Sequence, residues 1–106
     1  MGTAEGRAVS VYVIADLDVK DFGELSKYAE AAPATIAAHG GRYLVRRGTI
    51  KVVEGKWKPK LLSILEFPSW AAAEEWYNSA EYRRIIDIRK RAAPTDLVMV
   101  EGVPPR

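Results

Sequence analysis

The order in which strand-like and helix-like hydrophobic patterns alternate is the feature that most restricts the fold of this chain. Residues 9–15, VSVYVIA, are β-branched and aromatic and are typical of a buried strand. Residues 42–47 (RYLVRR), 61–67 (LLSILEF) and 95–102 (TDLVMVEG) have the same character. Helical patterns separate the first strand from the second and the third from the fourth. The order β-α-β-β-α-β predicts an α+β, ferredoxin-like domain, with an antiparallel four-stranded sheet and helices on one face.

Capping residues mark the limits of the first helical region. Apolar side chains recur every three or four residues from Asp21 to Ala38, so one face of this helix is apolar. Pro33 lies within the run and predicts a kink about one turn before the end of the helix. Gly40 follows His39, and a glycine just after a helix is the expected left-handed cap.

The second helical region is predicted as two consecutive helices. Ser69 is a good N-cap for residues 70–77, and Ser79 can cap a further helix that begins at residue 80. Pro94 stops that helix, because proline cannot continue the backbone hydrogen bonding. Residues 50–55, IKVVEG, are expected to add a short extended piece between the two middle strands.

The length and composition are those of one globular domain. The chain has 106 residues, of which 48% are hydrophobic and 28% are charged. We expect a flexible N-terminus over residues 1–8, the folded domain over 9–102 and a frayed tail over 103–106. No apolar stretch is long enough to span a membrane, so we expect a cytoplasmic protein without a membrane partner.

Composition also argues against several kinds of site. The chain has no cysteine and a single histidine, so we expect no disulfide, no thiolate nucleophile and no metal site. The net charge is +2, with sixteen Lys and Arg scattered among fourteen Asp and Glu, unlike the basic stripe of a nucleic-acid-binding protein. Neither GxxxxGK(S/T) nor GxGxxG occurs, so a nucleotide is not expected and we predict no cofactor.

One face of the predicted sheet stays apolar after the helices have covered the other. By strand alternation, this face carries Tyr12, Ile14, Leu44, Ile64 and Met99. Such a large apolar surface is unfavourable in water, so we predict that a second copy of the chain covers it. The expected assembly is a homodimer.

Five sequence blocks, in this order, resemble the uncharacterised family called domain of unknown function 1330: HGGRYLVR, VVEGKWKP, LLSILEFPS, WYNSAEYRRIIDIR and LVMVEG. The resemblance runs from about Val9 to Gly102. That family belongs to the dimeric α/β-barrel superfamily, in which two ferredoxin-like subunits join their sheets face to face, so the resemblance implies the same dimer. The superfamily includes cofactor-free monooxygenases, lactone isomerases and haem-binding enzymes, which share the fold and not the chemistry. The resemblance implies a site within each half-barrel, with motif positions Gly40, Gly41, Arg46, Glu54, Gly55, Glu66, Phe67, Tyr77, Ser79, Tyr82 and Arg89.

His39 has two interpretations. Its imidazole titrates near neutral pH without help and could act as a general base. Alternatively, it is the last residue of a helix, where its positive form favours the negative end of the helix dipole. We favour the second interpretation, because capping alone accounts for the position, and keep His39 as a candidate ligand contact.

Arg46 and Glu66 are the polar residues that we expect on the open face of the sheet. Alternation places Arg46 with Leu44, and Glu66 with Ile64. Arg46 could hold an anionic or carbonyl oxygen of a small ligand, while Glu66 accepts a proton or a hydrogen bond. A structural ion pair between them, or across the dimer, is an equally good explanation.

The remaining candidates are wall residues. Tyr12, Glu54 and Tyr77 are expected to line the same pocket, whereas most tryptophan and tyrosine side chains are expected in the core or the dimer contact. Arg89 lies on the apolar side of its helix, and we expect it to pair with a carboxylate.

The sequence favours a protein that binds a small organic metabolite in a pocket between the open sheet face and the ends of the helices. The alternatives are a cofactor-independent monooxygenase or isomerase acting on a small oxygenated or aromatic metabolite, and a structural dimer without a ligand. The sequence leaves open whether the protein is an enzyme.

Overall fold

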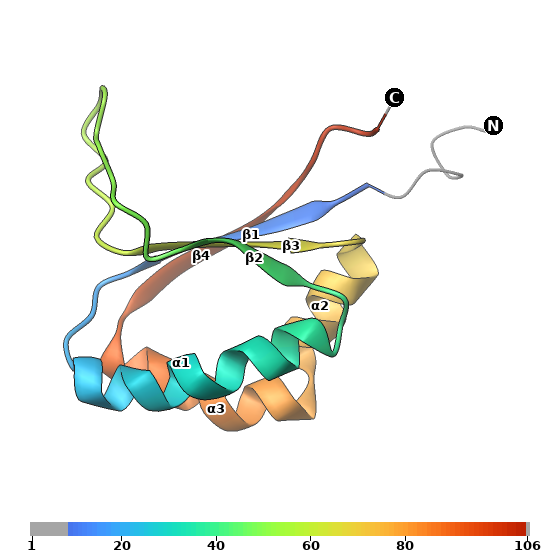
Figure 1. Cartoon of the computed structure of the whole chain (residues 1–106), viewed down its shortest axis with the longest axis horizontal. Coiled ribbons are helices and arrows are strands. Elements are labelled where there is room, and N and C mark those ends of the chain that lie inside the picture. The colour runs from blue at the N-terminus through green and yellow to red at the C-terminus, as the bar shows by residue number, and fades with distance from the viewer. Residues whose placement is uncertain (1–8, 106) are drawn as a thin grey trace.

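The computed structural model describes residues 9–105 of the chain. The predicted flexible N-terminus, residues 1–8, and the last residue of the predicted tail lie outside the described residues. Within residues 9–105, three helices cover one face of a four-stranded antiparallel sheet (Figure 1). This arrangement confirms the predicted α+β class.

The elements follow one another in the order strand, helix, strand, strand, helix, helix, strand. Their bounds are β1 Val11–Leu17, α1 Phe22–Ala37, β2 Arg42–Arg46, β3 Leu62–Phe67, α2 Trp70–Asn78, α3 Ala80–Ala92 and β4 Thr95–Glu101. The strand order in the sheet is β2-β3-β1-β4, so that β1 is central and β2 and β4 form the edges. β1 extends two residues beyond its predicted end, because Asp16 keeps its place in the ladder opposite Leu62 and Asp96. The extended piece predicted over residues 50–55 forms no strand.

α1 is capped at both ends, and its C-terminal cap is the glycine turn that the sequence predicts. The Asp21 carboxylate accepts a hydrogen bond from the Glu24 backbone N–H at the start of α1. After α1, Gly40 has a φ of 79°, and the Gly41 N–H donates back to the Ile36 carbonyl at 3.0 Å. Pro33 lies inside α1, which continues to Ala37.

Serine caps separate the two later helices. The Ser69 hydroxyl accepts from the Ala72 N–H at the start of α2. The Ser79 hydroxyl accepts from the Tyr82 N–H, while its own backbone N–H donates to the Trp76 carbonyl. Ser79 therefore ends α2 and begins α3, as the sequence predicts.

The core lies between the sheet and the helices. Val11, Val13, Ala15 and Leu17 alternate along β1 toward the helices and are all buried. The aromatic rings of Phe67, Trp76 and Tyr82 pack against this row, with 4.2 Å between the ring centroids of Trp76 and Tyr82. Trp76 also donates from Nε1 to the buried Thr35 hydroxyl at 3.0 Å.

A β-bulge in β2 contradicts the predicted face of Arg46. The ladder pairs Tyr43 with Leu65, then Val45 with Ile64, which leaves Leu44 as an extra residue. Arg46 therefore pairs with Ser63 and turns to the helix-covered face. Glu66 stays on the opposite face, so the two residues expected to lie together lie on opposite sides of the sheet.

The face of the sheet opposite the helices, called the open face below, differs from the prediction in one further residue. Met99 points to the helices and packs against the core. Val98 and Val100 of β4 lie on the open face instead, opposite Ile14 and Tyr12 of β1, and are 56% and 47% exposed. Apolar side chains therefore occupy the middle of this face, whereas its two ends carry charged residues, Asp16 and Asp96 at one end and Arg42 and Glu66 at the other.

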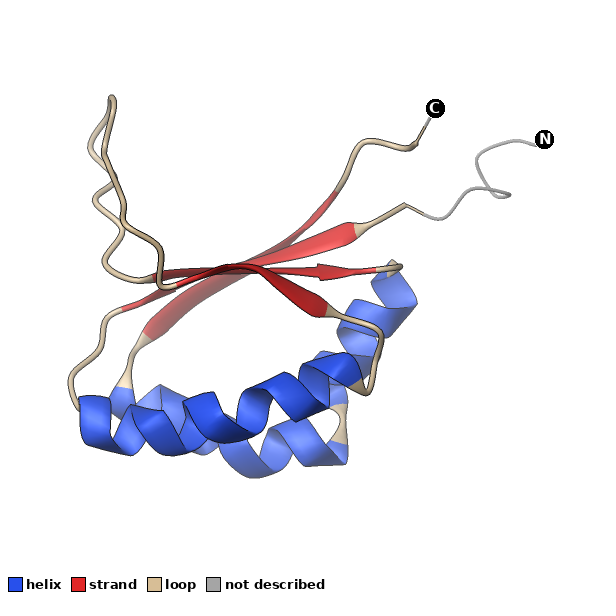
Figure 2. Ribbon diagram, viewed as in Figure 1, coloured by secondary structure: helices blue, strands red, loops and turns tan. Residues whose placement is uncertain are grey.

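The segment between β2 and β3, residues 47–61, forms a long arm that leaves the sheet on the side away from the helices (Figure 2). The carboxylate of Asp16 holds the part of the arm that precedes β3. It accepts one hydrogen bond from Trp57 Nε1 at 3.1 Å and one from the Lys60 backbone N–H at 2.9 Å. No helix within residues 9–105 combines the length and apolar character needed to cross a bilayer.

Candidate functional site

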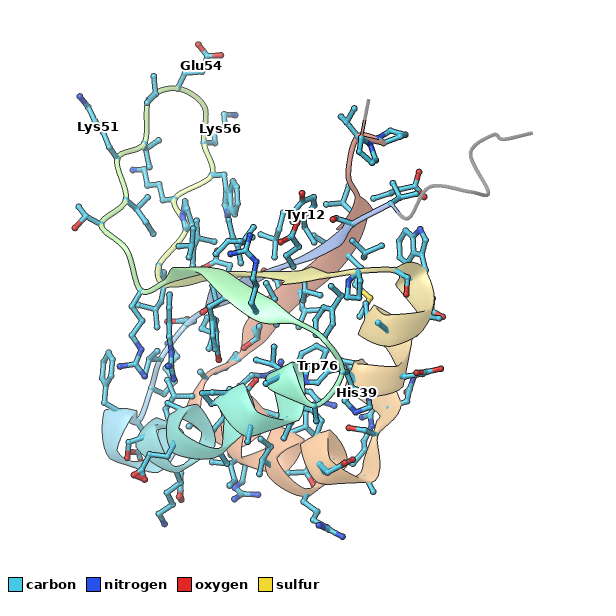
Figure 3. The ribbon with its side chains drawn as sticks, turned by 45° about the vertical axis from the view of Figure 1, so that its right-hand side comes forward. Tyr12, His39, Lys51, Glu54, Lys56 and Trp76 are labelled. Atoms are coloured by element: carbon cyan, nitrogen blue, oxygen red, sulfur yellow. The ribbon has the colours of Figure 1, made fainter. Side chains whose placement is uncertain are left out.

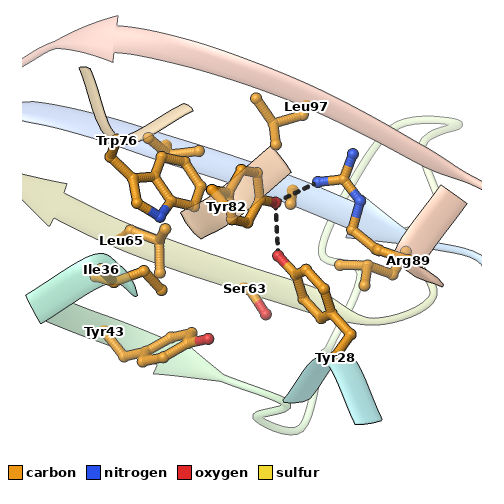
Figure 4. A pocket seen from close by; sticks show the side chains of 12 residues that line it. Tyr28, Ile36, Tyr43, Ser63, Leu65, Trp76, Tyr82, Arg89 and Leu97 are labelled. Atoms are coloured by element: carbon orange, nitrogen blue, oxygen red, sulfur yellow. Dashed lines mark hydrogen bonds between the residues drawn. The ribbon is translucent and has the colours of Figure 1, made fainter. Parts of the chain in front are cut away.

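A small cavity lies inside the molecule, between the sheet and helices α1 and α3 (Figure 4). Its volume is about 40 Å³. At about 10–15 Å³ for each water-sized position, this is room for about three water molecules. Its wall is mostly apolar and consists of Val13, Ala15, Leu17, Tyr28, Ile36, Tyr43, Ser63, Leu65, Trp76, Tyr82, Arg89 and Leu97.

Three polar side chains meet in the wall of this cavity. The hydroxyl oxygens of Tyr28 and Tyr82 are 2.6 Å apart, and Arg89 Nη1 donates to the Tyr82 oxygen at 3.0 Å (Figure 4). Arg89 is only 5% exposed. Its Nε is buried and has no partner among the described residues. We call Tyr28, Tyr82 and Arg89 the polar cluster.

The predicted carboxylate partner of Arg89 is absent from the structure. No aspartate or glutamate within residues 9–105 forms an ion pair with it, and none lines the cavity. The expectation was wrong because it rested on the general need of a buried cation for a counterion. In this fold, a tyrosine hydroxyl occupies one guanidinium donor and the charge is not neutralised.

The two phenols of the polar cluster are held in their neutral form. Burial raises the pKa of Tyr28 far above its ordinary value, and the neighbouring Tyr82 hydroxyl raises it further. Burial also raises the pKa of Tyr82, although the charge of Arg89 opposes this effect. Both side chains are therefore O–H donors at any physiological pH and are poorly suited to act as bases.

Helix geometry explains why these residues meet. Tyr82 and Arg89 are seven residues apart on α3, which is two helical turns, so both lie on its buried face. Tyr28 projects from α1, which packs alongside α3. The ring of Tyr28 lies edge-on to the ring of Tyr82, with 6.0 Å between the centroids.

A second, smaller hollow of about 30 Å³ continues from the cavity toward the surface. The two share Leu17, Tyr28, Tyr43 and Ser63 in their walls. Arg46 lies in the wall of this outer hollow, where its Nη2 donates to the Ala29 carbonyl of α1 at 2.7 Å. Its guanidinium also lies over the Tyr43 ring, 4.6 Å from the centroid. Arg46 thus bridges α1 and β2 at the outer end of the hollow.

Glu66 forms an ion pair, but with Arg42 rather than Arg46. Arg42 Nε donates to the Glu66 carboxylate at 3.0 Å, and the Tyr12 hydroxyl donates to its other oxygen at 3.4 Å. Hydrogen bonds from Ser10 and Arg42 lower the pKa of Glu66 below its ordinary value. Glu66 and Tyr12 therefore lie together on the open face, away from the cavity.

The other predicted ligand contacts do not converge. Figure 3 shows Glu54 at the tip of the arm and His39 on the helix side of the sheet. His39 lies in the turn two residues after the end of α1, rather than being the last residue of the helix as expected, and its Nε2 is buried without a partner among the described residues. The Tyr77 ring packs on Trp76 and under the guanidinium of Arg83, outside the cavity wall. Ligand binding by these residues stays a prediction.

Sequence reasoning missed Tyr28, Tyr43 and Ser63 as cavity residues. A signal existed for Tyr28, because it lies three residues after Leu25 and four before Ala32, on the apolar face of its helix. Arg89 carried the same signal, as a charge on an apolar face. Alternation along β3 places Ser63 with Leu65 on the helix-covered face, opposite Ala15 of β1, but no local pattern indicated a cavity there.

Comparison with known proteins places the chain in a family. The family model described as "Domain of unknown function (DUF1330)" matches residues 10–103. No curated protein matches the chain.

Two solved structures are similar in fold. The first is RPA0582, a protein of unknown function from Rhodopseudomonas palustris, with a TM-score of 0.74 and 17% sequence identity, covering 93% of this chain and 86% of that chain. The second is a conserved protein from Methanosarcina mazei Go1, with a TM-score of 0.59 and 15% identity, covering 91% of this chain and 95% of that chain. At these identities the likeness concerns the fold alone. The family match spans nearly the whole chain, and the protein therefore belongs to the DUF1330 family, as its sequence blocks predicted.

Proposed function

We propose that this domain binds a small organic metabolite in the cavity between the sheet and helices α1 and α3. The observation that carries the proposal is the polar cluster, in which a buried guanidinium and two paired phenols border an internal cavity. Burying such groups is unfavourable, and apolar side chains of similar size would stabilise the fold more simply. A ligand that forms hydrogen bonds with these groups offsets the free-energy cost of burying them.

The proposed pocket differs in position from the one expected from the sequence. It lies on the helix-covered side of the sheet, so Glu66 and Tyr12 are not part of it. Arg46 remains part of the proposal. It lies at the outer end of the second hollow, where its side chain reaches from β2 to the Ala29 carbonyl of α1.

The proposal includes a homodimer of ferredoxin-like subunits, with the open faces of two copies packed together as a barrel. It is supported by the valine side chains of β4, which are about half exposed, and by Ile14 and Ile64 beside them on the open face. Apolar surface of this kind is stabilised when a second copy removes it from water. The pocket proposed above lies on the other side of each sheet, so it does not need the partner to be complete.

The experiment that tests the function is capture of a metabolite by the purified protein. The protein is incubated with a pool of small metabolites, separated from unbound material and denatured, and the released compounds are identified by mass spectrometry. Ser63→Leu fills the junction of the two hollows, whereas Ile64→Val alters the neighbouring residue on the opposite face and serves as the control. We expect the wild type and Ile64→Val to retain the same compound and Ser63→Leu to lose it.

Other outcomes contradict the proposal. Retention of nothing by the wild type would favour a structural dimer with a filled interior. Equal retention by all three proteins would place the binding site elsewhere. Oxygen consumption or isomerisation of the captured compound would identify the alternative, a cofactor-independent monooxygenase or isomerase.

A further inference from the structure

The polar cluster contains more hydrogen-bond donors than acceptors. A guanidinium can only donate, so the Tyr82 oxygen accepts from Arg89 Nη1. The two phenols have one O–H each, and only one of these can lie in the short contact between their oxygens. Whichever phenol donates, the O–H of the other remains without an acceptor among residues 9–105. The N–H group at Arg89 Nε is a second donor that has no acceptor among the described residues.

The cluster also contains an excess of positive charge. Arg89 is the one charged residue in the cavity wall, and no described carboxylate pairs with it. The phenols beside it stay neutral, so they do not offset its charge. Hydrogen bonds from an arginine to a carboxylate are short and strong, and a buried guanidinium is stabilised most by such a partner.

The size of the cavity limits what this partner can be. A volume of about 40 Å³ corresponds to about three water-sized positions, which is the scale of formate or acetate. Leu97, Val13 and Leu65 provide an apolar wall around the remainder of the cavity. A carboxylate head with a short carbon tail fits both the donors and the wall.

We infer that the cavity binds a small carboxylate, whose oxygens accept hydrogen bonds from Arg89 and from the free phenol O–H of the Tyr28–Tyr82 pair. This inference rests on the proposed function, because it names the class of ligand that the same cavity takes. Arg89 is the binding residue that supplies the charge, and Tyr82 orients its guanidinium.

Thermal unfolding with matched probes tests the inference. The melting temperature is measured during titration with sodium acetate or acetamide, with the ionic strength held constant by sodium chloride, so that sodium chloride alone is the reference for acetate. Acetamide has the same number of non-hydrogen atoms as acetate and no charge. We expect a saturable rise with acetate and no comparable rise with acetamide or chloride.

Variants assign the effect to the cluster. Arg89→Gln removes the charge, and Arg91→Gln removes an exposed arginine from the same helix as the matched control. We expect the affinity for acetate to fall at least tenfold in Arg89→Gln and to be unchanged in Arg91→Gln. Should Arg89→Gln fail to fold, the Arg89 Nε–H resonance of the wild-type protein decides, because it must shift with acetate and stay in place with acetamide.

The outcomes separate this inference from the proposed function. Equal binding of acetate and acetamide would overturn the carboxylate preference and leave a metabolite pocket in place. A rise with acetate that persists in Arg89→Gln would show a nonspecific ion effect and overturn the inference. If neither acetate nor acetamide binds and the metabolite pool yields no compound, both proposals fail.

Discussion

Glu66 has features that are expected both of a structural contact between strands and of a residue in a binding site. A carboxylate beside the apolar residues of a sheet face favours a functional explanation. In the structure its two oxygens accept hydrogen bonds from Arg42 of β2 and Tyr12 of β1, the two strands that flank its own strand β3. Its ionised form is stabilised by these donors, so its role at this scale is to hold neighbouring strands together.

The lowered pKa of Glu66 predicts how it affects stability at different pH values. The ionised carboxylate stabilises the folded protein above its unfolded pKa of about 4.3, and this contribution disappears as the pH falls through its lower folded pKa. We therefore expect Glu66→Gln to melt at a lower temperature than the wild type near neutral pH, and the difference to shrink as the pH falls below the unfolded pKa and to vanish below the lowered folded pKa. Melting curves across this range check the prediction. Glu75→Gln, on the exposed surface of α2, should show no such convergence.

Among the elements, the arm over residues 47–61 is held to the sheet by the Asp16 side chain together with backbone hydrogen bonds at its two ends. Asp16 lies at the end of β1 on the open face, where its carboxylate accepts from Trp57 and from the backbone of Lys60. Arg47, at the start of the arm, has a positive φ of 61°, a conformation that few residues other than glycine adopt. The arm is thus directed away from the sheet by its first residue and fixed near its end by Asp16.

Asp16→Ala is expected to release the arm without unfolding the sheet. Loss of a hydrogen bond to a charged group at a partly exposed site costs about 1 kcal/mol, which corresponds to about a fivefold larger open population. Trypsin should therefore cleave after Lys51 and Lys56 about five times faster in the variant, since cleavage follows the open population. Asp18→Ala is the control, because Asp18 pairs with Lys20 and does not contact the arm. Equal rates in both variants would mean that Asp16 does not hold the arm.

At the scale of the whole molecule, the sheet has two different faces and one of them is without a cover in a single copy. The helices bury the inner row of β1 completely, whereas the open face leaves Val98 and Val100 about half exposed. Both termini of the described chain and the arm extend from this side or its edges (Figure 1). A second copy would meet these segments as well as the sheet.

Val98→Glu tests the proposed dimer. A carboxylate within the apolar contact would be buried without a partner, so association should be lost. We expect the wild type to have about twice the 11.8 kDa mass of one chain by light scattering, and the variant to have the mass of one chain. Lys90→Glu, on the exposed side of α3, should leave the mass unchanged. A wild type that is monomeric at micromolar concentration would contradict the homodimer.

Features that depend on neighbours in the chain were predictable from the sequence. The serine caps at Ser69 and Ser79 bond to N–H groups three residues away, and the glycine turn after α1 closes on Ile36. The apolar periods that predicted the strands and helices reflect burial on one face of each element. These are local rules, so the α+β class and the element order followed from the sequence alone.

The tertiary structure alone decided which polar residues meet. Alternation assumes an unbroken ladder, and the single extra residue Leu44 reverses the face of every residue after it in β2, including Arg46. Tyr28 and Tyr82 are separated by 54 positions, so their contact depends on how α1 packs against α3. The residues predicted from spacing were thus distributed over both faces and the arm, while the cavity formed where all four strands and all three helices contribute to a wall around a buried arginine.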